Sequence, residues 1–169
     1  YALTVFALIA ILPIAAADWE PVPGRIMTQW AEDVDPANPW PEYPRPQLER
    51  DNWVNLNGLW NYAVRPKETA ETRHLTPDTP TKWDGRILVP FCIESALSGV
   101  KRKFTPNDRL WYSRSFAPPV LGEGERLVLN FGAVDYEATV YVNGTKLGTH
   151  TGGYDAFSFD ITKALKPDG

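Results

Sequence analysis

A two-residue Asn-Gly turn constrains the fold of this chain more than any other feature. Asn143 and Gly144 separate the β-rich run ATVYV (138–142) from TKLG (145–148). Both central residues of a type I′ turn need a positive φ angle, and Asn and Gly tolerate that conformation better than other residues. The pattern therefore predicts a tight β-hairpin.

A glycine-rich segment follows the hairpin and leads to another β-rich run. It reads HTGGYDAFSFDIT and covers residues 150–162. We expect Gly152 and Gly153 to provide the backbone freedom for a corner before the next strand. Tyr154 and Phe157 are expected to cover the edge of the core with their rings.

Short runs with the composition of strands recur along the chain. In LVLNF, Leu127, Leu129 and Phe131 share one face. No run has the 3.6-residue apolar period of a long amphipathic helix. Short strands separated by turn residues are typical of a β-sandwich or jelly roll, whose inner faces form one core about 10 Å thick. The expected strands are residues 58–64, 86–89, 110–116, 126–131, 138–142, 145–148 and 157–161.

The composition agrees with an all-β fold. The 169 residues include 16 Pro, 12 Gly and seven each of Trp, Tyr and Phe, which suits many short strands joined by turns. The 17 basic and 21 acidic residues give a net charge of −4 without a basic stripe, and this argues against a nucleic-acid partner. A chain of this length has room for one domain with a hydrophobic core and some extended sequence.

The N-terminal region is typical of a secretory leader. Residues 2–17 are almost wholly apolar and end in three alanines, a small-residue pattern that favours signal-peptide cleavage. We therefore expect residues 1–17 to be a signal peptide, a secreted or periplasmic protein, and no membrane association after cleavage. The main alternative is a membrane anchor whose flank is missing, although the run is shorter than the roughly 20 residues of a span. Because the sequence begins with Tyr1 and lacks a positively charged n-region, we expect it to be incomplete at this end.

Three regions follow from this reading of the chain. Residues 18–46 are rich in Pro and Trp and lack a steady period, so we expect an extended lead-in along a domain surface. Residues 47–169 form the predicted domain, and residues 67–82 within it are expected to be a polar loop.

Several stretches resemble, in order and spacing, the N-terminal sugar-binding domain of glycoside hydrolase family 2, the group of β-galactosidases, β-glucuronidases and β-mannosidases. The hairpin and corner resemble the family pattern V-x-V-N-G followed by G-x-H-x-G-G-Y-x-x-F-x-x-D-I-T. RDNWVNLNGLWNY (50–62) resembles the family's opening strand, with Tyr62 in place of the commoner Phe. The other similar stretches are ILVPFCIES (87–95), LWYSRSF (110–116) and GAVD (132–135).

The resemblance implies a fold and a role. The implied fold is an all-β, jelly-roll-like β-sandwich of the galactose-binding-domain type, which precedes an immunoglobulin-like sandwich and a catalytic (β/α)8 barrel. Retaining hydrolysis needs two carboxylates about 5 to 5.5 Å apart, and in this family both are glutamates on the barrel, which the sequence does not reach. The resemblance therefore implies a non-catalytic sugar-binding domain of a secreted glycosidase that hydrolyses O-glycosyl bonds of β-glycosides. The chain ends in KPDG, where the family usually continues with G-x-N-x-L, so a C-terminal truncation is also expected.

The candidate sugar contacts are Glu94, Trp83, His150 and Asp155. Glu94 follows a strand in a loop flanked by Pro, where sandwich domains present ligand contacts. Pairing of Glu94 with Arg114 or with a backbone N–H is the favoured interpretation. For His150, a hydrogen bond that holds the corner in place is favoured over a sugar contact.

Other polar and aromatic residues near these candidates have simpler interpretations. Asp155 and Asp160 follow the corner, where acidic side chains commonly accept N–H bonds from turns, and we interpret Asp160 as structural. Trp83 and Trp111 are expected to be exposed rings that offer a platform for the face of a sugar. Core packing is favoured for Trp111, because it lies in a strand.

Special chemistry is not expected elsewhere. The single cysteine, Cys92, cannot form an internal disulfide, and its apolar neighbours favour a buried thiol over a nucleophile. The two histidines, His74 and His150, do not suggest a metal site, and no cofactor is expected. Asn143-Gly144-Thr145 fits the N-glycosylation sequon, so Asn143 is a candidate glycan site in a eukaryotic secretory route, although the turn already explains the Asn-Gly pair.

Two other hypotheses stay open at this point. The chain is a free-standing carbohydrate-binding module or lectin, in keeping with a jelly roll rich in aromatic residues, or a structural β-sandwich that binds only its neighbouring domains. The favoured hypothesis has as partners a carbohydrate and the immunoglobulin-like and (β/α)8 barrel domains of the parent chain.

Overall fold

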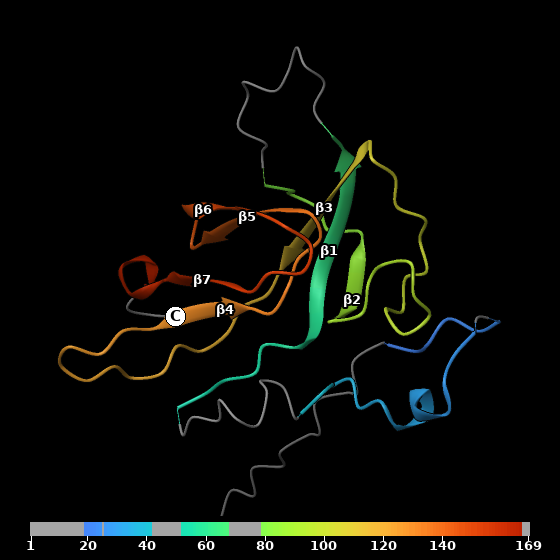
Figure 1. Cartoon of the computed structure of the whole chain (residues 1–169), viewed down its shortest axis with the longest axis horizontal. Helices are drawn as coiled ribbons and strands as arrows, with labels where there is room; N and C mark the ends of the chain where they lie inside the picture. The colour runs from blue at the N-terminus through green and yellow to red at the C-terminus, as the bar shows by residue number, and fades with distance from the viewer. Residues whose placement is uncertain (1–18, 25, 42–51, 68–78, 167–169) are drawn as a thin grey trace, which may run out of the picture. The chain divides into compact units, whose positions relative to one another are not determined.

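The computed structural model describes residues 19–24, 26–41, 52–67 and 79–166, and this part of the chain is all-β (Figure 1). All its strand pairs are antiparallel, consistent with a galactose-binding-like β-sandwich domain. The chain divides into two compact units, Tyr1–Arg114 and Ser115–Gly169, which are described separately. The helical elements of the described residues are two 3-10 turns, η1 (Gln29–Asp33) and η3 (Thr162–Ala164).

Two predictions from the sequence concern residues that lie wholly or mostly outside the described ranges. The expected signal peptide, residues 1–17, lies outside the described residues, as does most of the expected polar loop at residues 67–82. Within the described ranges, no helix has the length and apolar character needed to cross a membrane.

The first unit contains a three-stranded sheet. Its central strand, β1 (Gly58–Pro66), lies between β2 (Gly85–Val89) and β3 (Asp108–Ser113). Valine and isoleucine side chains from β1, β2 and the following loop form the buried centre of this unit. The cluster consists of Val64, Ile87 and Ile93, with Trp60, Tyr62, Val100, Phe104 and Leu110 packed against it.

The loop after β2 folds around a fully buried hydroxyl group, that of Ser98. Its Oγ lies 2.8 Å from the carbonyl oxygen of Ser95 and 3.1 Å from that of Ile93, and it accepts the N–H of Val100 at 3.1 Å. The carbonyl of Ser98 accepts the N–H of Leu88 at 3.0 Å, which joins the loop to β2. Ser98 therefore provides partners for loop backbone groups that water does not reach.

The same loop holds the first described residues of the chain. Trp19 Nε1 donates to the carbonyl of Leu97 at 3.1 Å, and the N–H of Val22 donates to the carbonyl of Ala96 at 3.0 Å. Two hydrogen bonds from widely separated parts of the sequence therefore fix residues 19–22 against the loop.

Asp84 connects β1 with the turn that precedes β2. Its Oδ2 accepts the N–H of Val64 at 2.8 Å, and its Oδ1 lies 2.8 Å from Arg65 Nη1. The hydrogen bond from Val64, followed by that from Arg65, holds the pKa of Asp84 below its ordinary value. The folded state therefore favours the charged form of this carboxylate.

The second unit contains two strand pairs. β4 (Val128–Phe131) pairs with β7 (Phe157–Asp160), and β5 (Glu137–Val142) pairs with β6 (Thr145–Thr151). Both turn residues between β5 and β6 have positive φ angles, 51° at Asn143 and 83° at Gly144. The predicted hairpin is confirmed.

Aromatic rings fill the space beside β7. The rings of Phe131 and Phe157 stack with centroids 4.7 Å apart, and Phe159 meets Phe157 edge-on at 5.9 Å. Gly148 on β6 makes room for this group, because an added β-carbon there would lie 2.6 Å from Phe159 Cε1. The expected alternation along β4 is confirmed, since Leu129 and Phe131 are half-buried while the residues between and before them are exposed.

Each of the expected runs forms a strand, although every strand differs from its expected bounds by one to three residues at one end or both. The run predicted at residues 110–116 ends at Ser113, and the run predicted at residues 145–148 continues to Thr151. β6 is longer because its pairing with β5 extends to Glu137 opposite Thr151. Turn and strand composition therefore located the elements, while cross-strand pairing set their ends.

The prediction that Cys92 is buried is wrong. Cys92 is exposed, whereas its neighbour Ile93 is buried in the cluster of the first unit. The segment turns immediately after β2, where the N–H of Phe91 donates to the carbonyl of Leu88 at 3.1 Å. In this turn the isoleucine contributes to the core and the cysteine does not.

Substitution of the buried serine tests the organisation of the loop. We expect Ser98→Ala to lower the free energy of unfolding by about 1–3 kcal/mol, because loop backbone groups would lose their buried partner. Urea titration followed by tryptophan fluorescence measures the change. Ser158→Ala removes an exposed hydroxyl from β7 and is the matched control. Equal losses in the two variants would contradict the assigned role of Ser98.

Acid unfolding tests the contribution of Asp84. Because its pKa is lower in the folded chain than in the unfolded chain, the carboxylate stabilises the fold above about pH 4, and this stabilisation is lost as the pH falls further. We expect Asp84→Asn to be less stable at pH 7 and to lose less stability than the wild type between pH 7 and pH 3. Urea midpoints at the two pH values provide the measurement, with Glu123→Gln as a charge-matched control. An unchanged pH dependence in Asp84→Asn would refute the assignment.

Candidate functional site

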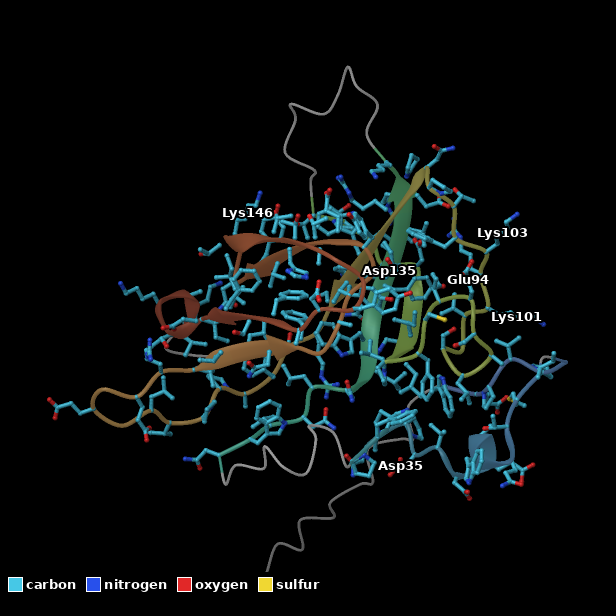
Figure 2. All side chains as sticks on the ribbon, in the orientation of Figure 1. Asp35, Glu94, Lys101, Lys103, Asp135 and Lys146 are labelled. Carbon is cyan, nitrogen blue, oxygen red and sulfur yellow. The ribbon has the colours of Figure 1, made fainter. Side chains whose placement is uncertain are left out.

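The candidate site is the glycine corner, which we define as the loop residues 133–136 before β5 and residues 152–156 after β6. The N–H of Gly152 donates to the carbonyl of Tyr136 at 2.8 Å and joins the two loops. Figure 2 labels Asp135 in the first of these loops and Lys146 beside the hairpin turn, at the opposite end of the β5–β6 hairpin. The corner therefore lies where the open end of the hairpin meets the chain leading to β7.

Two glycines allow side chains to approach the backbone closely at this corner. A β-carbon added at Gly152 would lie 2.8 Å from Asp155 Oδ2 and 3.3 Å from His150 Nε2. One added at Gly153 would lie 2.9 Å from Asp135 Oδ1. Gly152 also has a φ angle of 142°, a conformation that residues with side chains rarely adopt. The expected backbone role is confirmed at Gly152, and both glycines make room for a carboxylate.

His150 is held by ring stacking. Its imidazole stacks on Phe157 with centroids 4.1 Å apart and an interplanar angle of 15°. Its Nε2 is buried and has no hydrogen-bond partner in the described part of the chain. The hydrogen bond expected of His150 is therefore not formed within the described residues, because its ring lies against the flat face of Phe157, which offers a stacking surface and no hydrogen-bonding group.

Two tyrosines and two aspartates are exposed at the corner. Tyr154 is 97% exposed and Tyr136 is 65% exposed. Asp135 and Asp155 are exposed too, and neither forms a hydrogen bond or an ion pair within the described residues. The prediction that Tyr154 covers the core edge is wrong, because His150 occupies the stacking position on Phe157.

Asp160, in contrast, is engaged by its surroundings. Its Oδ1 accepts the N–H of Thr162 at 3.0 Å, and its Oδ2 lies 3.8 Å from Arg126 Nη1. Hydrogen bonds from the Thr162 side chain and backbone lower the pKa of Asp160. The interpretation of Asp160 as structural is confirmed.

Glu94 and Trp83 belong to the first unit and not to the corner. Glu94 Oε1 accepts the N–H of Phe104 at 3.3 Å, which confirms the favoured backbone interaction. Figure 2 labels it on the loop that also carries Lys101 and Lys103. Arg114 does not pair with Glu94, because its Nη1 donates to the carbonyls of Leu56 and Asn57 at 2.8 and 2.7 Å.

The two tryptophans are less accessible than expected. Trp83 and Trp111 are half-buried, so neither is the exposed platform that the sequence suggested. Trp111 lies in β3 opposite Ala63 of β1, which agrees with the packing role favoured for it. The most exposed rings of the corner are tyrosines.

Tyr136 and Asp135 were not among the predicted contacts. Asp135 ends the GAVD stretch (132–135), which contributes to the family resemblance, and Tyr136 directly follows it. The hydrogen bond that joins them to the corner spans 16 positions of sequence, from Tyr136 to Gly152. No short motif signals a contact of this kind.

Asn143 lies in the exposed turn at the other end of the hairpin. Its Nδ2, the atom to which a glycan would be attached, donates to the carbonyl of Ala164 at 2.9 Å. This bond connects the turn to η3. Among the described residues, no group of three or more His, Cys, Asp or Glu side chains is arranged to hold a metal ion.

Comparison with known proteins shows which protein family this sequence is similar to. Residues 96–169 match the family described as glycosyl hydrolase 2, galactose-binding domain-like. A β-glucuronidase of Paenibacillus borealis is 25% identical over 131 residues, which cover 74% of this chain and 20% of that protein. A β-glucuronidase of Bacteroides fragilis is 32% identical over 116 residues, which cover 67% of this chain and 14% of that protein.

The chain is also similar in structure to a solved β-glucuronidase. The β-glucuronidase of Faecalibacterium prausnitzii superposes with a TM-score of 0.51 at 28% identity, covering 72% of this chain and 20% of that chain. The present chain thus spans a fifth or less of the length of these three relatives.

Substitution of Gly152 tests the geometry of the corner. We expect Gly152→Ala to cost at least about 2 kcal/mol of unfolding free energy, because a φ of 142° is strained for any residue with a β-carbon, whereas the flexible Asp155 side chain can move away from that β-carbon. Gly124→Ala is the matched control, since Gly124 has a positive φ of 77° but nothing within 4 Å of its added β-carbon, and should cost only about 1 kcal/mol. Chemical denaturation measures both. Equal costs would mean that the backbone at Gly152 is no more strained by a β-carbon than the backbone at Gly124.

Proposed function

Because the chain belongs to glycosyl hydrolase family 2 through its galactose-binding domain-like region, we propose that it is the non-catalytic sugar-binding domain of a secreted enzyme that hydrolyses β-glycosides. The observation that carries the proposal is the family match over residues 96–169, which includes the hairpin and the glycine corner. The β-glucuronidases similar to this chain support the choice of β-glycosides as the substrate class.

Three aspartates of this chain have a structural role that agrees with a non-catalytic domain. A retaining glycosidase needs a general acid whose pKa is raised and a second carboxylate nearby as the nucleophile. In Asp84, Asp108 and Asp160 the pKa is instead lowered, and each of them accepts hydrogen bonds from a neighbouring strand or turn. These carboxylates stabilise the fold in their charged form.

The chemistry would then reside in other domains of the parent enzyme. The length of the relatives, of which this chain spans about a fifth, supports an immunoglobulin-like domain and a (β/α)8 barrel as covalent partners. The apolar residues 2–17 support secretion, or export to a periplasm, by a cleaved signal peptide.

Activity and binding assays on the 169-residue chain test the proposal. We expect no release of nitrophenol from nitrophenyl β-galactoside, β-glucuronide or β-mannoside, because the two catalytic carboxylates are supplied by another domain. Calorimetric titration with the corresponding methyl glycosides should give heats of binding with dissociation constants in the millimolar range. Turnover by the chain alone would refute the non-catalytic role, and the absence of any binding heat would refute sugar recognition.

The gene provides an independent test of the domain partners. Reading it beyond codon 169 is expected to reveal an immunoglobulin-like domain and a barrel with two glutamates. A stop codon directly after Gly169 would favour a free-standing carbohydrate-binding module.

A further inference from the structure

We propose that the glycine corner is itself a sugar-binding site and that it selects uncharged hexopyranosides over glycosiduronates. The inference rests on the proposed function, since it identifies where and how that domain recognises a carbohydrate. It depends on three properties of the corner, which are its exposed rings, its unengaged carboxylates and its charge.

The rings provide the stacking surface. Tyr154 and Tyr136, 97% and 65% exposed, belong to loops joined by the hydrogen bond from Gly152 to the Tyr136 carbonyl. An exposed aromatic ring is suited to stack on the apolar C–H face of a pyranose, while its phenol hydroxyl remains available for a hydrogen bond. The ring stack of Phe131, Phe157 and His150 supports the corner from within the unit.

The carboxylates provide the hydrogen-bond acceptors. Asp155 Oδ2 lies 2.8 Å from the position that an added β-carbon would take at Gly152, and Asp135 Oδ1 lies 2.9 Å from the corresponding position at Gly153. These two glycines are consecutive, so the two carboxylates lie close to adjacent residues of the backbone. An ionised carboxylate accepts hydrogen bonds only, and the vicinal hydroxyls of a sugar are donors of matching chemistry. Elsewhere in this unit Asp160 is already occupied by Thr162.

The charge of the corner determines the class of sugar. Asp135, Glu137 and Asp155 are all exposed, and the stretches 132–137 and 150–157 contain no lysine or arginine. The nearest described basic residue along β6 is Lys146, beside the turn at the far end of the hairpin. A uronate carboxylate would therefore meet like charges at the corner, and neither of these two stretches supplies a lysine or arginine to compensate them, which opposes its binding.

Calorimetric titration of the 169-residue chain tests the inference, with methyl β-galactoside, methyl β-mannoside and methyl β-glucuronide as probes at low ionic strength. We expect at least one uncharged glycoside to bind at least about 3-fold more tightly than the glucuronide, and the difference to shrink as salt is added. Equal affinities at low salt would overturn the selectivity.

Variants locate the binding site. Tyr154→Ala should weaken binding of the uncharged glycoside by about 3- to 10-fold through the loss of stacking, whereas Val120→Ala, at a residue that is 99% exposed outside the corner, should leave it unchanged. Asp155→Asn should improve binding of the glucuronide relative to the uncharged glycoside by about 3-fold, and Glu123→Gln should not. Circular dichroism checks that each variant remains folded.

The outcomes separate the two proposals. If sugars bind and Tyr154→Ala and Asp155→Asn behave as their controls, the corner is not the site and the inference fails, while sugar recognition by the domain stands. If no glycoside gives a heat at millimolar concentration, the proposed function fails, and the inference fails with it.

Discussion

The hairpin turn at Asn143 and Gly144 is the constraint on which the second unit depends. Two positive φ angles in succession fix a two-residue loop, which pairs Val142 with Thr145, and a register shift between Val140 and Tyr141 then sets the pairing toward the open end of the hairpin. The register places His150 opposite Ala138 near the open end of the hairpin, where its ring reaches Phe157 of β7. A slip of one residue would turn this imidazole to the opposite face and remove the support of the glycine corner.

The acidic side chains divide into two groups with different physical states. Asp84 and Asp160 accept hydrogen bonds from backbone N–H groups, and their lowered pKa values mean that the fold stabilises their charge. Asp135 and Asp155 have no such partners in the described residues, although each lies close to a glycine of the corner. A carboxylate that the fold does not use retains its full capacity to accept hydrogen bonds from a ligand. This contrast is the reason to look for recognition at the corner.

The prediction of the fold succeeded further than the prediction of the site. Strands and turns depend on local composition and alternation, so the hairpin and the strand positions followed from neighbouring residues alone. His150 and Asp155 were also identified, because both flank the glycine pair in sequence. Tyr136 was missed and Tyr154 was assigned to the core, because the contact between their loops and the stacking of His150 are non-local. Glu94 accepts a backbone N–H of its own unit, as the favoured interpretation of its loop position expected.

By itself the sequence determined the all-β class, the type I′ turn, the corner and the family, since each depends on residue type at fixed short spacing. Only the tertiary structure decided which aromatic rings are exposed and which carboxylates are unengaged. Exposure depends on what other segments of the chain cover, and a hydrogen-bond partner is decided by distance in space. For that reason Cys92 is exposed beside a buried isoleucine, and Tyr154 faces solvent although its neighbours in sequence line the ring stack.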